Sequence, residues 1–257
     1  MVIEVKKKKK KLKKIFIIVG SIFLVLVISF LFLLYGPYSG FRDFLITSSM
    51  TTKSHQYIAK FFYSDKTIDK VLKKNGIIEG DKSTDTNLIN IKKKKKSKTY
   101  KNEYEKQILD RNEDESLYKV INVSGKTYQG YLVAIYDPSR VGIATTRYLG
   151  VRGEAIDNVA KRYGAVVAMN AGGFYDPDWN SNGALPHGIV IENGKVVSEY
   201  AKANVGGGMV GFTNDNKLVL GKFSKSEALN MGIRDAVEFG PFLIINGEAS
   251  KVLGNGG

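Results

Sequence analysis

The feature that most constrains this chain is a run of 21 residues without a charged side chain, Ile15 to Tyr35. At about 1.5 Å of rise per residue, a helix of this length covers a hydrocarbon core of about 30 Å. A core helix of a soluble domain is rarely this long and this uniformly apolar. The run therefore predicts a transmembrane helix over residues 15–35, with a lipid membrane as its partner.

The flanks of this run predict its orientation. Residues 1–14 carry eight lysines and one glutamate, and a basic segment before a membrane helix favours a cytoplasmic N-terminus. A cleaved signal peptide is the alternative, but its apolar region is shorter and ends at an Ala-x-Ala-like site. Residues 35–40 offer no such site. We expect an uncleaved signal-anchor in the cell membrane, single-pass, with the C-terminal domain extracytoplasmic; export follows from either alternative.

The distribution of charge argues against a nucleic-acid partner. The net charge is +14, but residues 1–14 contribute +7 of it, and residues 116–257 hold 14 Lys and Arg against 12 Asp and Glu. A nucleic-acid-binding module is expected to carry its basic face on the folded domain. The chain has no cysteine, which excludes disulfides, thiolate zinc sites and a cysteine nucleophile. We predict no nucleic-acid partner.

Residues 36–116 form a predicted stalk and linker. Apolar residues recur at helical spacing between Tyr57 and Leu72, which predicts one or two amphipathic helices ending near Asn75-Gly76. Such a face could pack on the domain or lie at the membrane interface. Residues 80–115 are polar, with a lysine run at 92–96, and are typical of a flexible linker.

Residues 117–257 predict an α+β domain, mostly antiparallel mixed sheet with few helices, after the transmembrane helix. Three hairpins are expected around Asn193-Gly194, 214–216 and Asn246-Gly247, and Ser224 with Glu227 fits a capping box. Arg152–Tyr163 predicts a helix that Gly164 ends. The predicted single strands are Tyr118–Val123, Tyr131–Tyr136, Val141–Thr146 and Val166–Met169.

The most informative motif of this domain follows the last of those strands. The apolar run Val166–Met169 predicts a buried strand, and Asn170 stands where it ends. Gly172 and Gly173 then offer a backbone that a ligand can approach closely. A tight turn after a core strand is the alternative. Loops after strand ends often carry binding and catalytic residues, so the motif is also a candidate site.

Three motifs in order resemble the phosphodiester glycosidase family, whose best-known member is the lysosomal uncovering enzyme. They are Met169 to Tyr175, Pro186-His187-Gly188 with its hairpin, and Gly240-Pro241-Phe242-Leu243 with Asn246-Gly247. The resemblance covers about Val120 to Gly257. Bacterial relatives are often labelled exopolysaccharide-biosynthesis proteins. The family's later Arg-Thr-Ala-x-Gly and Asp-Gly-Gly-Gly-Ser motifs do not occur here, so we expect a C-terminally truncated domain.

The resemblance implies hydrolysis of a sugar-1-phosphodiester at its glycosidic bond, on cell-surface polysaccharide or a glycoconjugate. Asn170 would bond a sugar hydroxyl or a phosphoryl oxygen, and the Gly172 and Gly173 N–H groups would face the phosphate. Phe174 and Tyr175 would stack on the sugar ring, with ordinary core packing as the alternative. The partner is then a sugar-phosphate substrate or cell-wall polymer.

Further candidates complete the predicted site. Asp176 could act as acid or base, although aspartate is also a routine turn residue, and His187 is weighed against an exposed loop histidine. Arg234 and Glu238 fit a solvent salt bridge and a surface carboxylate better than site roles. The expected catalytic residues are Asn170, Asp176 and His187, and the expected substrate-binding residues are Gly172, Gly173, Phe174, Tyr175, Trp179, Gly240 and Pro241.

No cofactor is expected. Oxygen-bearing side chains alternate over Asp176–Asn182, which leaves Ca²⁺ open there, but an EF-hand glycine and glutamate are missing from the required spacings. Two functions from other classes stay open beside the glycosidase. One is a non-enzymatic envelope module that binds glycan, and the other is an inactive truncated remnant of the family.

Overall fold

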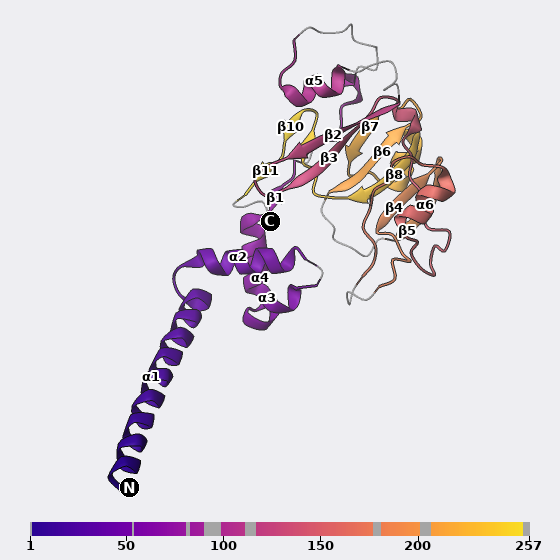
Figure 1. Ribbon diagram of the computed structural model, residues 1–257. Helices are drawn as coiled ribbons and strands as arrows, with labels where there is room; N and C mark the ends of the chain where they lie inside the picture. Colours follow the sequence, from indigo (N-terminus) through magenta and orange to yellow (C-terminus); the bar gives the residue numbers. More distant parts are fainter. Residues whose placement is uncertain are drawn as a thin grey trace. The chain divides into compact units, whose positions relative to one another are not determined.

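A computed structural model gives the fold of the chain and divides it into two compact units (Figure 1). Unit 1 comprises residues 1–78 with 251–257, and unit 2 comprises residues 79–250. The structure describes residues 2–52, 54–80, 83–89, 99–110, 117–176, 181–200 and 207–253.

Unit 1 begins with the helix α1, Val2–Tyr35. Its segment Leu12–Tyr35, 24 residues, is long and apolar enough to cross a membrane. The side chains from Leu12 to Leu33 are exposed, whereas Leu34 is buried. A helix that is apolar on all sides and has no protein around it is suited to lipid. The predicted N-terminal apolar helix is therefore present.

Three short helices follow α1 in unit 1: α2 Ser39–Met50, α3 Gln56–Phe62 and α4 Asp65–Asn75. α3 and α4 confirm the amphipathic pieces expected between Tyr57 and Leu72, whereas α2 was not predicted. Each buries a few apolar side chains in a common core that also receives the last turn of α1. The buried residues of that core are Leu34, Ile46, Ala59, Tyr63, Ile68 and Val71.

Unit 1 ends in a short antiparallel pair of strands. β1, Ile77–Ile78, pairs with β11, Lys251–Val252, from the far end of the sequence. The Leu253 N–H also donates to the Gly76 carbonyl at 2.9 Å. The segment that follows the stalk helices and the last described residues are thus held together.

Unit 2 is built on a five-stranded sheet in the order β5-β4-β8-β6-β7, in which every pairing is antiparallel (Figure 1). Asn193 and Gly194 both adopt positive φ in the β4–β5 turn, as a two-residue hairpin of this type requires. The strands are β4 Gly188–Glu192, β5 Lys195–Tyr200, β6 Gly208–Thr213, β7 Leu218–Gly221 and β8 Ile233–Phe239.

One face of this sheet packs on α7, Lys225–Asn230, which begins at the predicted capping box. The Ser224 side chain accepts from the Glu227 N–H, and the Glu227 carboxylate accepts from the Ser224 N–H. A buried cluster joins helix and sheet: Ile191, Met209, Val219, Ala228, Ile233 and Ala236. The helix thus covers the centre of the sheet.

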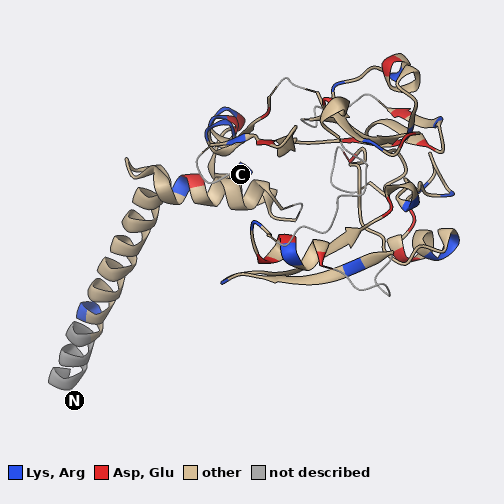
Figure 2. Ribbon diagram, turned by 90° about the horizontal axis from the view of Figure 1, so that it is seen from above, with Lys and Arg blue, Asp and Glu red and all other residues tan. Residues whose placement is uncertain are grey.

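The remaining elements of unit 2 are short. The hairpin of β2 and β3 and that of β9 and β10 confirm two further predictions, and the α+β class with mostly antiparallel sheet is observed. Basic and acidic residues are interspersed along these elements (Figure 2). The elements are η1 Thr86–Leu88, α5 Glu103–Leu109, β2 Tyr118–Ser124, β3 Gln129–Ile135, η3 Pro138–Arg140, α6 Ile156–Tyr163, β9 Ile244–Ile245 and β10 Glu248–Ala249.

Two predicted strands are wrong. In residues 141–146 the N–H groups of Ile143 and Thr145 donate to the carboxylates of Asp235 and Glu192, so they are not available to a neighbouring strand. In residues 166–169 no strand forms, and Val166 and Met169 are 77% and 82% exposed. An apolar β-branched run becomes a strand only where a ladder partner exists, and the described part of the chain supplies none here.

The predicted helix Arg152–Tyr163 is right in its last eight residues only. The Arg152 carbonyl accepts from the Thr146 hydroxyl at 3.0 Å, and the Gly153 N–H donates to the Asn182 carbonyl at 2.7 Å. These bonds hold residues 152–153 in a non-helical backbone, so α6 begins at Ile156. Gly164 ends the helix in the left-handed conformation at φ 61°, as predicted.

Candidate functional site

The glycine motif lies antiparallel to the segment that leads into β4. The Tyr175 N–H donates to the Leu185 carbonyl at 2.8 Å, and the His187 N–H donates to the Gly173 carbonyl at 2.9 Å. Phe174 forms an isolated bridge with Pro186 between these two bonds. Two of the motifs that sequence analysis singled out, Met169–Tyr175 and Pro186–Gly188, are therefore neighbours.

A Cβ would be tighter than ordinary contact at Gly173, whereas at Gly172 it would lie at ordinary contact distance. A Cβ on Gly173 would lie 3.1 Å from Cδ2 of His187, and a Cβ on Gly172 would lie 3.4 Å from Cβ of Val237. Val237 belongs to β8. The ring of Phe239, the last residue of β8, lies 3.8 Å from the place that a Cβ on Gly173 would take. The motif thus packs against the last residues of β8 and against the histidine.

His187 is the buried polar residue of this cluster, only 9% exposed. Its Nδ1 is buried and has no hydrogen-bond partner in the described part of the chain. Burial lowers the pKa of its imidazole below the ordinary value of 6.5, so the ring is neutral at pH 7. The ring meets Tyr175 edge-on at 6.4 Å, and Tyr175 meets Tyr200 of β5 at 5.2 Å. The alternative of an exposed loop histidine is wrong.

Glu238 of β8 is the acid of the cluster. It lies over Gly188, which has φ +64° and whose hypothetical Cβ would fall 1.9 Å from the Glu238 Oε2. Burial raises the pKa of this carboxyl group above its ordinary value, and a hydrogen bond from the Ile189 backbone offsets only part of that rise. Sequence analysis favoured a surface carboxylate here, and the half-buried position contradicts it. The nearby Gly240-Pro241 was the signal that could have identified Glu238.

Asn170, Phe174 and Asp176 are placed less closely. Asn170 is exposed and stands two residues before Gly172, within about 7 Å of chain. Phe174 is largely exposed, which agrees better with a contact surface than with core packing. The Asp176 Oδ1 accepts from the Ser181 N–H at 2.7 Å, as an aspartate in a turn does.

The other part of that turn lies outside the described residues. Trp179, a predicted substrate contact, is among residues 177–180. The described residues contain no group of three His, Cys, Asp or Glu side chains that could hold a metal ion. The calcium alternative over Asp176–Asn182 depends on 178 and 180 and stays a prediction.

Gly240 and Pro241 form a cis peptide bond just after β8. A Cβ on Gly207 would lie 2.4 Å from the Phe239 carbonyl and 2.5 Å from Cα of Gly240, so this turn is tightly enclosed. The carboxylate of Glu79 accepts from the Gly207 N–H at 2.8 Å and also from the Phe242 N–H. This carboxylate bonds two backbone N–H groups beside the turn.

Arg234 has neither of the roles that the sequence suggested. Its guanidinium donates to the carbonyls of Val141 and Pro138, each at 2.9 Å, and pairs with Asp235. Asp235 is 3% exposed and accepts from the N–H groups of Ile143 and Asn193. The pair holds the loop before residue 144 and the β4–β5 turn, so Arg234 is a structural residue rather than a phosphate ligand or a solvent salt bridge.

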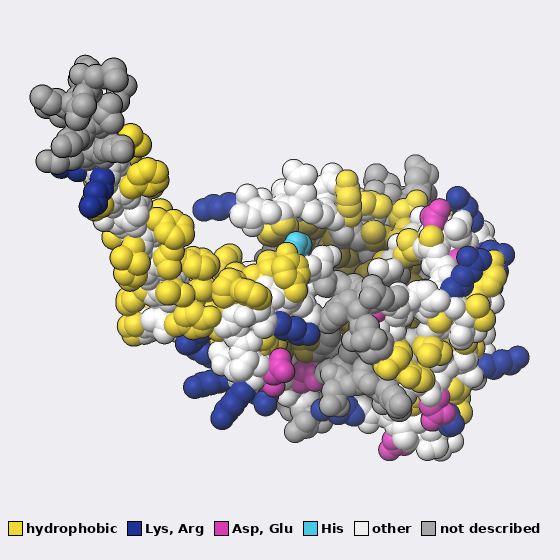
Figure 3. Space-filling model, turned by 90° about the horizontal axis from the view of Figure 1, so that it is seen from below, with side chains coloured by type: hydrophobic (Ala, Val, Ile, Leu, Met, Phe, Trp, Pro, Cys, Tyr) yellow, Lys and Arg dark blue, Asp and Glu magenta, His cyan; other side chains and the backbone are white. Residues whose placement is uncertain are grey.

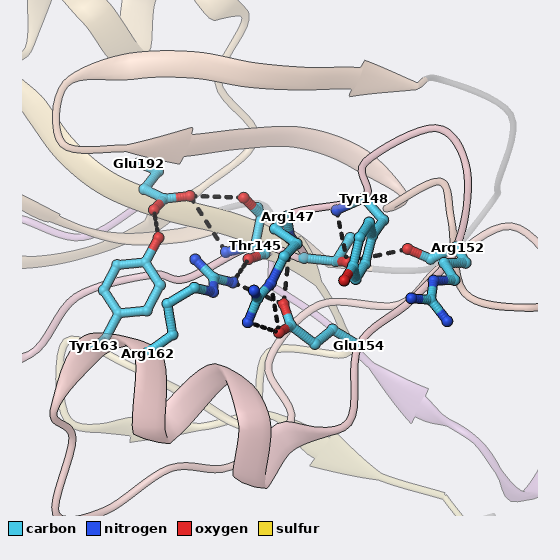
Figure 4. Close-up of polar contacts among 9 residues, drawn as sticks. Thr145, Arg147, Tyr148, Arg152, Glu154, Arg162, Tyr163 and Glu192 are labelled. Atoms are coloured by element: carbon cyan, nitrogen blue, oxygen red, sulfur yellow. Dashed lines mark hydrogen bonds and ion pairs between the residues drawn. The ribbon is translucent and has the colours of Figure 1, made fainter.

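A second polar cluster attaches the residues 145–154 to α6 and β4 (Figure 4). Glu154 lies between Arg147 and Arg162, with ion-pair distances of 2.8 and 2.9 Å. Burial opposes its ionisation, but the hydrogen bonds from both arginines outweigh it and lower the pKa of Glu154 to about 2. Glu192 accepts from the Thr145 hydroxyl at 2.7 Å and from the Tyr163 hydroxyl. Sequence analysis did not identify this network, because its partners are distant in sequence.

A neutral imidazole, a carboxyl group of raised pKa and a close-packed glycine turn are components of an acid–base site. The family model described as phosphodiester glycosidase matches residues 163–257, which confirms the resemblance for this part of the chain. The glycine motif, His187, Glu238 and Gly240-Pro241 all lie inside the matched region. No curated protein and no solved structure matches the chain.

Proposed function

We propose that this protein is a membrane-anchored, extracytoplasmic glycosidase that hydrolyses sugar-1-phosphodiester bonds of a cell-surface polysaccharide or glycoconjugate. One observation carries the proposal: residues 163–257 match the phosphodiester glycosidases, and Gly173, the buried His187 and the half-buried Glu238 lie within that match. The apolar helix α1 supports the anchored form.

In the proposed reaction, a water oxygen bonds to C1 of the sugar, and the bond between C1 and the phosphate oxygen breaks. The products are a sugar with a free 1-hydroxyl group and a phosphomonoester, and one proton of the water is released. Phosphate is a good leaving group, so the reaction depends less on a strong acid than the cleavage of an ordinary glycoside does. The site must bind an anion and position the water.

His187 is the proposed base for that water proton. Its low pKa leaves the imidazole unprotonated at neutral pH, which is the state that accepts a proton. Glu238 lies over the next residue, Gly188, and burial raises its pKa, which favours the protonated form. An ionised carboxylate would repel the phosphodiester, whereas a neutral carboxyl group can donate a hydrogen bond to a phosphoryl oxygen.

The glycine motif is the proposed phosphate and sugar contact. The N–H groups of Gly172 and Gly173 donate no hydrogen bond within the described part of the chain, so they are available to an anion. Asn170 would bond a sugar hydroxyl, and the exposed ring of Phe174 would stack on the sugar with Tyr175 beside it. Trp179 and the Gly240-Pro241 turn remain proposed substrate contacts.

The test is an assay of free sugar released from N-acetylglucosamine-1-phosphate methyl diester, offered as both anomers to the purified full chain. We expect release from one anomer and a loss of roughly ten- to a hundred-fold in kcat/KM for Asn170→Ala, as expected for one lost hydrogen bond to the sugar. Asn122→Ala is the matched control, because Asn122 is exposed on β2, outside the matched region.

Two outcomes would count against the proposal. Equal activity of Asn170→Ala and the unaltered chain would remove Asn170 from the site. Absence of release from both anomers by a folded chain would contradict the glycosidase activity itself and leave glycan binding as the alternative.

A further inference from the structure

Helix α3 carries two large aromatic side chains that are mostly exposed. Tyr57 is 67% exposed and Phe61 is 80% exposed. Residues four apart lie on the same face of a helix, so the two rings form one stripe. Surface aromatics that occur singly need no explanation, but a stripe of two on a seven-residue helix indicates a contact surface.

The opposite face of α3 is fixed to the core of unit 1. Ala59 is fully buried, and the Gln56 amide donates to the Met50 carbonyl at 3.2 Å. Tyr63, directly after the helix, donates from its hydroxyl to the Leu34 carbonyl of α1 at 3.2 Å. The stripe of Tyr57 and Phe61 is therefore held outward and cannot turn into the bundle.

Contacts with α1 place α3 at the level of the apolar segment. The ring of Phe62 meets the ring of Phe30 edge-on at 6.0 Å, and the Tyr35 hydroxyl donates to the Phe62 carbonyl at 3.1 Å. Phe30 stands five residues before the end of the apolar run, or about 7 Å along the helix axis. Interfacial helices bury their apolar face about 5–10 Å into the boundary of headgroups and acyl chains, so this depth fits.

The surface around α3 continues that of α1. Hydrophobic side chains cover α1 and extend without a break onto the helices that follow it (Figure 3). Residues 36–78 also carry seven Lys and Arg against three Asp and Glu, and Lys66, Lys70 and Lys73 of α4 are exposed. Basic side chains beside an apolar surface favour anionic headgroups.

We propose that α3 lies in the membrane interface beside α1 and inserts the side chains of Tyr57 and Phe61 among the lipids. This proposal rests on the anchored form proposed above: the occupant of the aromatic stripe is the bilayer, because the stripe is continuous with a helix that is long and apolar enough to cross a membrane. The bundle of α2, α3 and α4 is then seated on the membrane rather than held away from it by a stalk.

The absence of cysteine makes the test direct. Single nitroxide labels are attached at Phe61→Cys, Tyr57→Cys and Lys60→Cys of the full chain, reconstituted in vesicles of equal parts phosphatidylcholine and phosphatidylglycerol. Lys60 is the matched control, because it is exposed on the same helix, one residue from Phe61. We expect the depth parameter from oxygen and nickel-complex accessibilities to be positive at 57 and 61 and negative at 60.

A second experiment uses tryptophan in place of the nitroxide label, in case the label itself disturbs the interface. Phe61→Trp in a Trp179→Phe chain should be quenched by brominated phosphatidylcholine, and Lys60→Trp in the same chain should not be. Labels at 57 and 61 that are as accessible to the nickel complex as the label at 60 would overturn the proposal. Low accessibility to both reagents would also overturn it, since that outcome means a protein partner.

Discussion

At the scale of single residues, the candidate site depends on what the glycines allow to approach. Gly188 adopts a left-handed φ of +64°, and the Glu238 carboxyl group occupies the space where a side chain at 188 would begin. The His187 ring likewise lies only 3.1 Å from the place where a Cβ at position 173 would be. The proposed base, His187, and the proposed hydrogen-bond donor, Glu238, are thus positioned by residues that have no side chain.

Gly188→Ala should destabilise unit 2 by about 1–2 kcal/mol for the left-handed backbone alone, and by more through the displaced carboxyl group. Denaturant unfolding monitored by circular dichroism measures the loss. Gly188→Ala combined with Glu238→Ala should recover the steric part but not the backbone part. A single variant as stable as the unaltered chain would mean that Glu238 does not pack on Gly188.

The pKa directions at this cluster predict the pH profile of the proposed activity. His187 must be unprotonated, so activity should rise with pH through a pKa below the ordinary 6.5 of histidine. Glu238 must be protonated, so activity should fall again through a pKa above the ordinary 4.5 of glutamate. Initial rates of sugar release across pH 4–9 measure both limbs. Glu238→Gln should remove the alkaline limb, and a variant that keeps the limb would exclude Glu238 as its source.

At the scale of elements, the loop from 145 to 154 shows how a segment without a ladder partner is held. Glu154 between its two arginines ties this loop to α6, while Glu192 ties it to β4 (Figure 4). The carboxylates of Glu154 and Glu192 accept the backbone hydrogen bonds that a neighbouring strand would otherwise accept. Element position here is therefore set by ion pairs.

Glu154 should make the stability of unit 2 depend on acid. Its pKa is about 2 in the folded chain and lies near 4.5 when unfolded, so its contribution is complete above pH 4.5 and is lost as the pH falls toward 2. Melting temperatures of the unaltered chain and Glu154→Gln should differ at pH 7, and the difference should shrink below pH 4.5 and vanish as the pH approaches 2. Asp157→Asn is the control, because its ion pair with Lys161 at 3.6 Å is exposed. An equal gap at both pH values would contradict the argument.

The sequence predicted the elements whose signals are local. Asn193-Gly194, Asn246-Gly247 and the Ser224 capping box each specify a turn or helix start within four residues, and all three are observed. The wrong predictions concern segments whose structure depends on partners that are distant in the sequence. Val141–Thr146 bonds to side chains far along the chain, and Val166–Met169 lacks a partner strand. The central strand β8 and the burial of Glu238 were missed for the same reason.

The candidate site was predictable in part. The glycine motif and the His187 segment were identified separately, and their adjacency required the backbone bonds between 173–175 and 185–187. The burial of His187 and Glu238 arises from packing between β4, β8 and the motif, which no local pattern reports. Sequence analysis favoured a solvent salt bridge for Arg234, because sequence does not show the carbonyls that it binds.

At the scale of the whole molecule, an anchor and a glycosidase-like region share one chain. The proposed topology places the N-terminus in the cytoplasm and unit 2 outside. In intact cells that produce the chain with an epitope at each end, external protease should remove the C-terminal epitope and leave the N-terminal one. Cells permeabilised with detergent should lose both. Protection of the C-terminal epitope in intact cells would reverse the topology and contradict an extracytoplasmic enzyme.

The pairing of β1 with β11 has a mechanical consequence. Any pull that α1 transmits along the chain passes through Ile77–Ile78, and this segment is held to Lys251–Val252 by only two residue pairs. The β2–β3 ladder, by comparison, has seven. Under a pull on α1, this short pair should separate before the longer ladders of the larger sheet do.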